Sequence, residues 1–169
     1  KELIEIGWFE GEGAEYFQKF GYALQKRKRY AEAIEAYLKA DTLKPDNIWN
    51  NRHLATCYRL NRNYEAALTY YKKVEEATPE STNVIFHIGS CLAELGQYEE
   101  AANYFFKLDF IESNCIKAWR AIGWCSFVNG KYEQAMKYYE KILGDEVLLG
   151  DLRIVTVSTS VSYTHLTLP

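Results

Sequence analysis

A spacing of 34 residues dominates this sequence and limits what it can fold into. At this interval the chain repeats one aromatic and one small residue type: Tyr30, Tyr64, Tyr98 and Tyr132, with Ala33, Ala67, Ala101 and Ala135. Four copies of the unit follow one another without gaps from Ala14, and residues 116–143 form the clearest copy. A period of this length indicates stacked supersecondary units that each contact only their neighbours.

The clearest copy shows which residues define the unit. Its skeleton is Trp119, Ile122, Gly123, Gly130, Tyr132, Ala135 and Tyr139. This skeleton at this period resembles the tetratricopeptide repeat, a helix–turn–helix unit. The resemblance implies an all-α fold, a right-handed superhelical solenoid of antiparallel helix pairs, and a function as a protein–protein interaction scaffold.

Prolines, glycines and capping residues predict the helix bounds. Pro45 and Pro79 each end a helix pair, because the residue before proline disfavours the helical conformation. We expect a break at Gly11 and Gly13. The predicted helices cover residues 14–27, 30–43, 48–60, 64–77, 83–95, 98–111, 116–128 and 132–143.

These helices divide the chain into repeats 14–47, 48–81, 82–115 and 116–147. Residues 1–13 are interpreted as the end of a preceding repeat or as an N-terminal cap. Residues 148–160 depart from the pattern. Residues 161–169, VSYTHLTLP, resemble a translated adapter of transposase-based sequencing libraries, so we expect a non-native scar there. We therefore expect a chain truncated at both ends.

The small aligned residues predict how the helices pack. Large side chains need small residues opposite them. The large residues are Phe17, Tyr37, Tyr71, Phe105, Trp119 and Tyr139, and we expect the aligned Gly21, Ala55, Gly89 and Gly123, with the aligned alanines of the second helices, to provide the room. Enlarging a small member should destabilise the fold by roughly 1–3 kcal/mol. The tyrosines Tyr70, Tyr104 and Tyr138 share another position, and we expect them to pack between repeats; a contact stripe on the convex side is the alternative.

Charge and cysteine usage constrain the partner class and the compartment. A net charge of -3 gives no general attraction to nucleic acid or to an anionic membrane. Cys57, Cys91 and Cys125 lie 34 residues apart, and neighbouring helices are too widely spaced to bridge them. We therefore expect free, buried thiols, which favour a reducing compartment and a cytoplasmic location.

The family resemblance places partner binding on a concave surface lined by the first helix of each repeat. Projecting the register onto that surface gives the predicted groove residues: Tyr22, Trp49, Arg52, Arg59, Phe86, Arg120, Trp124 and Phe127. Arginine binds carboxylates in a bidentate manner, and aromatic residues are common interface anchors. This pattern favours an extended or helical peptide with acidic and apolar residues. Alternatively, some of the aromatic side chains pack between repeats.

Two other functions remain open from the residues. The chain could be a structural spacer or assembly domain of a longer repeat protein that uses its ends or its convex face. A weaker alternative is RNA binding through Arg52, Arg59 and Arg120 with stacked aromatic residues.

Other specific partners and chemistries are not expected. A known use of the family is a clamp of lysines and asparagines that grips the C-terminal carboxylate of chaperone tails. The matching positions here hold Gln18 and Tyr22, Arg52 and Thr56, Phe86 and Ser90, and Arg120 and Trp124, so the clamp is absent.

His53 with Cys57, and His87 with Cys91, have a spacing that could ligate zinc. The cysteines, however, occupy a core position, and the two pairs belong to different layers. We predict no metal site, no cofactor and no catalytic residues.

Overall fold

A computed structural model of the chain describes residues 10–148, which form eight α-helices. The helices are α2 (Glu10–Lys26), α3 (Tyr30–Leu43), α4 (Ile48–Leu60), α5 (Tyr64–Ala77), α6 (Thr82–Glu94), α7 (Tyr98–Ile111), α8 (Ile116–Val128) and α9 (Tyr132–Leu148). The expectations about residues 1–9 and 149–169 lie outside the described residues.

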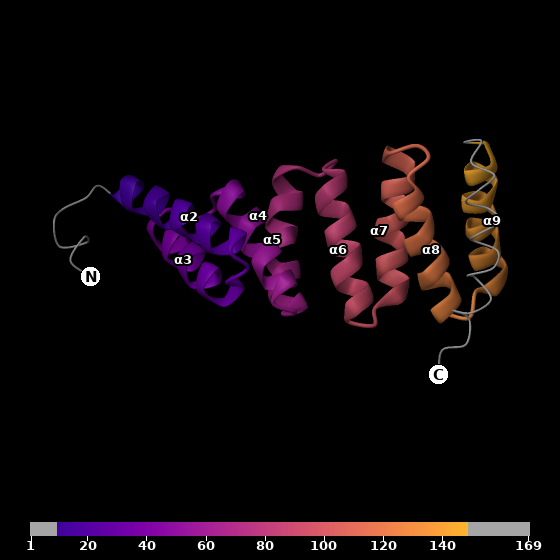
Figure 1. Cartoon of the computed structure of the whole chain (residues 1–169), viewed down its shortest axis with the longest axis horizontal. Coiled ribbons are helices and arrows are strands. Elements are labelled where there is room, and N and C mark those ends of the chain that lie inside the picture. The colour runs from indigo at the N-terminus through magenta and orange to yellow at the C-terminus, as the bar shows by residue number, and fades with distance from the viewer. Residues whose placement is uncertain (1–9, 149–169) are drawn as a thin grey trace.

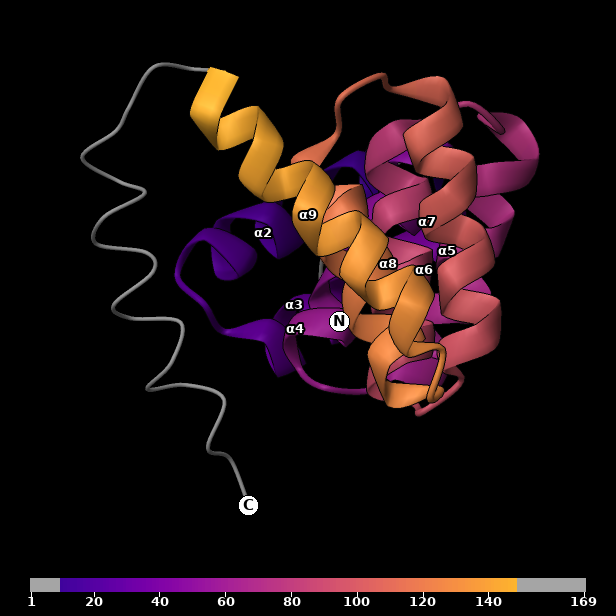
Figure 2. The same ribbon diagram turned by 90° about the vertical axis from the view of Figure 1, so that its right-hand side faces the viewer.

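The helix pairs follow one another in chain order and form a row along the long axis of the molecule (Figure 1). Each helix packs against the next one, both within a pair and between pairs. Seen from the end of the row, the helices differ in direction, so the pairs are rotated relative to one another (Figure 2). The fold is therefore the predicted all-α solenoid of helix pairs.

The helix bounds agree closely with the sequence prediction, with two differences at the ends. The expected break at Gly11 and Gly13 was wrong, since α2 begins at Glu10 and runs through both glycines. Glycine costs a helix only about 1 kcal/mol. A Cβ at Gly13 would lie 3.3 Å from Leu43 Cδ1, so the small residue suits the close packing of α2 on α3. Helix α9 continues past Gly144 to Leu148.

The turn within each pair also repeats every 34 residues. Lys28, Arg62, Gly96 and Gly130 all have positive φ, between 60° and 77°. Only glycine adopts this left-handed region without strain, which explains Gly96 and Gly130. Lys28 and Arg62 adopt it at a cost of roughly 1–2 kcal/mol each.

The core combines large aromatic residues with small ones, as the register predicted, and the structure shows which of them meet. Tyr37 and Tyr71 are fully buried, and Phe105 is 2% exposed. A Cβ at Gly89 would lie 2.8 Å from the Phe105 ring, and one at Gly21 would lie 3.0 Å from the Tyr37 ring. The glycines are therefore needed where the aromatic rings approach the helix backbone.

Polar contacts between the second helices of neighbouring pairs join successive repeats. Tyr104 donates a hydrogen bond to Glu75 at 3.3 Å, and Lys107 lies 2.9 Å from the same carboxylate. One repeat later, Lys141 lies 3.8 Å from Asp109. Packing between repeats is thus confirmed for Tyr104, which bridges α7 to α5. Cys57, Cys91 and Cys125 are buried and free, as the sequence predicted, and so is Cys115, for which no prediction was made.

Candidate partner-binding groove

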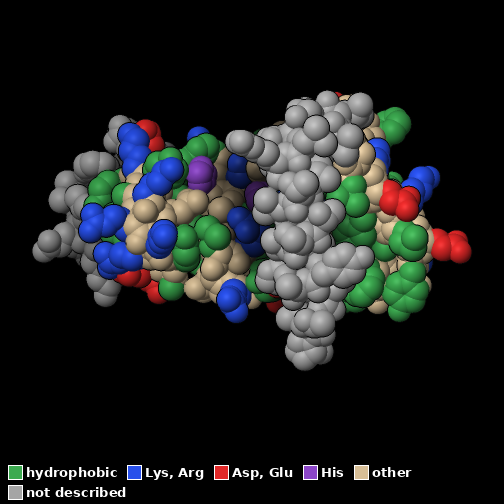
Figure 3. Space-filling model, turned by 45° about the vertical axis from the view of Figure 1, so that its right-hand side comes forward, with side chains coloured by type: hydrophobic (Ala, Val, Ile, Leu, Met, Phe, Trp, Pro, Cys, Tyr) green, Lys and Arg blue, Asp and Glu red, His purple; other side chains and the backbone are tan. Residues whose placement is uncertain are grey.

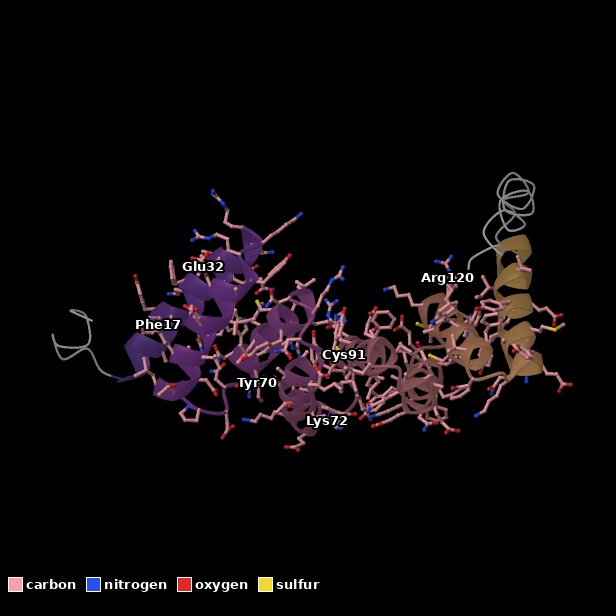
Figure 4. All side chains as sticks on the ribbon, turned by 90° about the horizontal axis from the view of Figure 1, so that it is seen from below. Phe17, Glu32, Tyr70, Lys72, Cys91 and Arg120 are labelled. Atoms are coloured by element: carbon pink, nitrogen blue, oxygen red, sulfur yellow. The ribbon has the colours of Figure 1, made fainter. Side chains whose placement is uncertain are left out.

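Helices α2, α4, α6 and α8 are the first helices of the four pairs, and we call their shared exposed surface the groove face. Figure 4 places Arg120 of α8 and Lys72 of α5 on opposite sides of the row. Figure 3 shows hydrophobic, histidine and Lys or Arg side chains mixed on one face. The groove face therefore offers both apolar contact and positive charge.

An aromatic cluster occupies the groove face between the first and second pairs. The Trp49 ring centroid lies 4.1 Å from that of His53 and 6.1 Å from that of Tyr22. Behind these rings, Gln25 Oε1 lies 3.0 Å from Tyr37 OH, which donates to it, and 3.0 Å from His53 Nδ1. Tyr22 and Trp49 are 38% and 43% exposed. The predicted groove residues Tyr22 and Trp49 are thus brought together, and the polar groups of Gln25, Tyr37 and His53 behind them are within hydrogen-bond distance of one another.

The equivalent position between the second and third pairs carries charge instead. Arg59 stands where Gln25 stands one repeat earlier, and His87 stands where His53 does. Within the described chain, Arg59 Nε and His87 Nδ1 are buried and have no hydrogen-bond partner. Burial, and secondarily the Arg59 cation, lowers the pKa of His87 to about 4. His87 is therefore neutral at neutral pH beside a permanent cation.

A pocket of about 620 Å³ opens between the third and fourth pairs. It lies between α6 and α8, and its lining includes three predicted groove residues, Phe86, Arg120 and Trp124. Phe105 and Cys125 also line it and are buried, so they form its base. Burial raises the pKa of the Cys125 thiol, which keeps this base uncharged.

The pocket exists because small residues replace larger ones at two repeated positions. Ala93 occupies the position of Gln25 and Arg59, and Ala121 occupies the position of His53 and His87. Both alanines line the pocket. The space that the earlier interfaces fill with polar side chains is therefore open between α6 and α8.

The remaining predicted residues lie elsewhere on this face. Phe127 stacks on Trp124, with ring centroids 6.1 Å apart, and contacts Tyr132 of α9. The Arg52 carbonyl accepts a hydrogen bond from Thr56, and its side chain is partly buried. The set predicted from the register is therefore spread over three interfaces, and three of its eight residues, Phe86, Arg120 and Trp124, line the pocket between α6 and α8. The other lining residues were not in the predicted set, and Ala93 and Ala121 are those that a comparison of side-chain size along the register would have revealed.

Charge around the pocket is mostly positive. Lys117 and Arg120 lie one turn apart on α8, and both are exposed. Among residues 13–144, whose side chains the structure describes, neither has a carboxylate partner, whereas Glu94 of α6 lines the opposite side. Across the same residues no group of three or more potential metal ligands occurs, and no helix has the length and hydrophobicity needed to cross a membrane.

Solved structures with this arrangement are numerous. One titled "MamA MSR-1 C2" is 29% identical, covers 76% of this chain and 74% of its own, and superposes with a TM-score of 0.72. MamA 41-end from Desulfovibrio magneticus RS-1 is 18% identical over 78% of this chain and 74% of its own, with a TM-score of 0.73. The first tetratricopeptide repeat domain of Spaghetti (RPAP3), bound to the HSP90 peptide SRMEEVD, is 20% identical. It covers 71% of this chain and 95% of its own, with a TM-score of 0.63. The last two are similar in fold alone.

Two family models match the sequence, and no curated protein does. The model described as anaphase-promoting complex, cyclosome, subunit 3 matches residues 26–108. The model described as tetratricopeptide repeat matches residues 92–146. Together they span residues 26–146, and with the stacked helix pairs they identify the chain as a member of the tetratricopeptide repeat family.

Proposed function

We propose that this chain is an interaction scaffold whose groove face binds a segment of another protein. The observation that supports the proposal most strongly is the exposure of aromatic residues that the solenoid does not need for its own core. Trp124 is 54% exposed and Phe127 is 46% exposed, whereas Trp119 on the same helix is 2% exposed. Large aromatic residues kept at a surface beside cations are typical of protein interfaces.

The charge of the groove face favours acidic segments. Arg52, Lys117 and Arg120 carry no ion pair within the described part of the chain. An incoming carboxylate would therefore not have to displace an internal one. Solved relatives include a tetratricopeptide repeat domain bound to a peptide that contains two glutamates and an aspartate, which is consistent with a scaffold of this kind. The clamp residues for such chaperone tails are still absent here, so we do not extend that ligand to this chain.

Capture from a lysate tests the proposal with two matched double variants. Arg52→Glu with Trp124→Ala reverses one charge and removes one aromatic ring on the groove face. Lys72→Glu with Phe110→Ala makes the same changes on the second helices, where Phe110 is 90% exposed. After equal helicity is confirmed, we expect a captured protein to be lost from the first variant alone. A partner retained by both variants would contradict groove binding.

A second candidate function is assembly through the ends of the stack. Phe20 of α2 is 50% exposed, although Leu54, Ile88 and Ile122 at the same repeated position are fully buried. An apolar residue at this position packs against a preceding helix pair in the other three repeats. Concentration-dependent association that Phe20→Glu abolishes would support this candidate, and unchanged mass over a hundredfold concentration range would oppose it.

A further inference from the structure

We propose that the pocket between α6 and α8 is a specificity subsite that receives one large apolar side chain from an acidic peptide segment. This inference rests on the proposed function and adds what the bound segment must contain. It concerns the lining residues Phe86, Ala93, Phe105, Ala121 and Trp124, together with the cations Lys117 and Arg120.

The inner surface of the pocket is suited to an apolar group. Phe86, Phe105 and Trp124 present aromatic carbon, and the two alanines add no polar atoms. The Ser90 hydroxyl also lines the pocket, but it donates to the Phe86 carbonyl at 2.8 Å and is thus satisfied. The other polar lining residues are Glu94, Tyr98, Lys117 and Arg120. Against the aromatic rings and the alanines, an apolar ligand group gains contact, whereas a polar one loses its hydration.

The volume distinguishes this interface from the other two. A pocket of about 620 Å³ falls within the range of roughly 300–1,000 Å³ found for ligand sites. At the same repeated positions, the first interface contains Gln25 and His53, with the His53 ring stacked on Tyr37 at 5.9 Å. The second contains Arg59 and His87, with the His87 ring stacked on Tyr71 at 5.6 Å. At the third interface both positions hold alanine, and both alanines line the pocket.

The charged residues at the edge of the pocket indicate the charge of the peptide segment that carries the apolar side chain. Lys117 and Arg120 are exposed on α8 and lack carboxylate partners among the described residues. Glu94 on α6 is the single acidic lining residue. Charge complementarity therefore places carboxylates of the segment next to α8. The occupant that fits is a peptide with a leucine, isoleucine, methionine or phenylalanine adjacent to aspartate or glutamate.

The repeat itself supplies a variant that should close the pocket without disturbing the fold. Ala121→His introduces the residue type that the chain already uses at this position in two other repeats. The new ring would face Phe105, the counterpart of Tyr37 and Tyr71. Ala31→His makes the same change at an exposed position of α3 and serves as the control.

The test begins with selection of a random dodecapeptide display library on the full chain. We expect the selected sequences to combine one large apolar residue with neighbouring acidic ones. Fluorescence polarisation then measures the best synthetic peptide. Replacing its apolar residue by alanine should weaken binding about tenfold or more, as for a central interface anchor. Ala121→His should weaken binding to a similar extent, and Ala31→His should leave it unchanged. Arg120→Glu should weaken binding roughly threefold, the effect expected for an exposed ion pair.

The outcomes separate the subsite from the proposed function. A peptide that binds the parent and Ala121→His equally, but not the Arg52→Glu, Trp124→Ala variant, would overturn the subsite and leave groove binding intact. Failure to select any peptide would count against both. A parent dimer that Ala121→His converts to a monomer would show that a second copy fills the pocket, and would overturn the peptide assignment.

Discussion

Replacing Trp119 by alanine tests the packing logic of the repeat. The Trp119 side chain is 2% exposed, and its indole N–H donates to Asp109 Oδ1 at 2.5 Å. The Lys141 ammonium lies 4.0 Å from the ring centroid. The side chain therefore joins α8 to α7 and α9 through apolar, hydrogen-bonding and cation–π contacts.

Removal of this ring should cost roughly 3–5 kcal/mol of unfolding free energy, the range for Trp→Ala in a protein core. For a chain of 169 residues, each kilocalorie lowers Tm by about 2–4 °C, so the expected decrease is about 6–20 °C. Trp119→Phe keeps most of the volume and loses only the indole hydrogen bond. It should cost about 1 kcal/mol.

Trp124→Ala provides a matched control on the same helix. Its side chain is 54% exposed, and a surface truncation of this kind should change stability by less than about 0.5 kcal/mol. Thermal unfolding followed by circular dichroism at 222 nm compares the three variants. The reasoning would be refuted if Trp119→Ala melted with the parent, or if Trp124→Ala melted as low as Trp119→Ala.

Three further predictions concern other buried groups. Gly89→Val should lower the free energy of unfolding by roughly 1–3 kcal/mol, because the new Cβ would meet the Phe105 ring. Gly144→Val, which has open space around it, should leave that free energy nearly unchanged, and urea titration compares the two variants. The pKa of His87 is lowered to about 4 in the fold, so the unfolded state binds more protons below pH 6.5. Stability should decrease by about 2 kcal/mol as pH falls from 6.5 to 4, and a His87→Phe melt that keeps the full decrease would contradict this. Burial raises the pKa of Cys57 to about 12 and that of Cys91 to about 11. A thiol reagent at pH 8 should therefore label these cysteines only after the protein unfolds, and rapid labelling of the native protein would contradict this prediction.

The sequence was sufficient to predict the helices because the repeat supplies four independent readings of the same unit. Tyr30, Tyr64, Tyr98 and Tyr132 each begin a helix, as the register indicated. The start of α2 was not predictable in the same way. Gly11 and Gly13 resemble a break, yet their small cost is offset by tertiary packing against α3.

The groove residues were harder to predict because register gives a position and not a volume. Trp49 and Trp124 both lie on the groove face, but Trp49 belongs to a filled aromatic cluster while Trp124 borders a pocket. The difference arises from the joint size of residues on adjacent helices, such as Ala93 and Ala121. Similarly, the Arg59 and His87 pairing depends on how two successive first helices face each other.

Photo-crosslinking tests the central claim, groove binding, most directly. The peptide selected on the full chain would carry a diazirine analogue of leucine at its apolar position, and mass spectrometry would locate the crosslinks. The account predicts crosslinks within residues 86–98 and 117–125, and their loss in Ala121→His. Crosslinks confined to α7 or α9, for example at the exposed Phe110 or Met136, would contradict it.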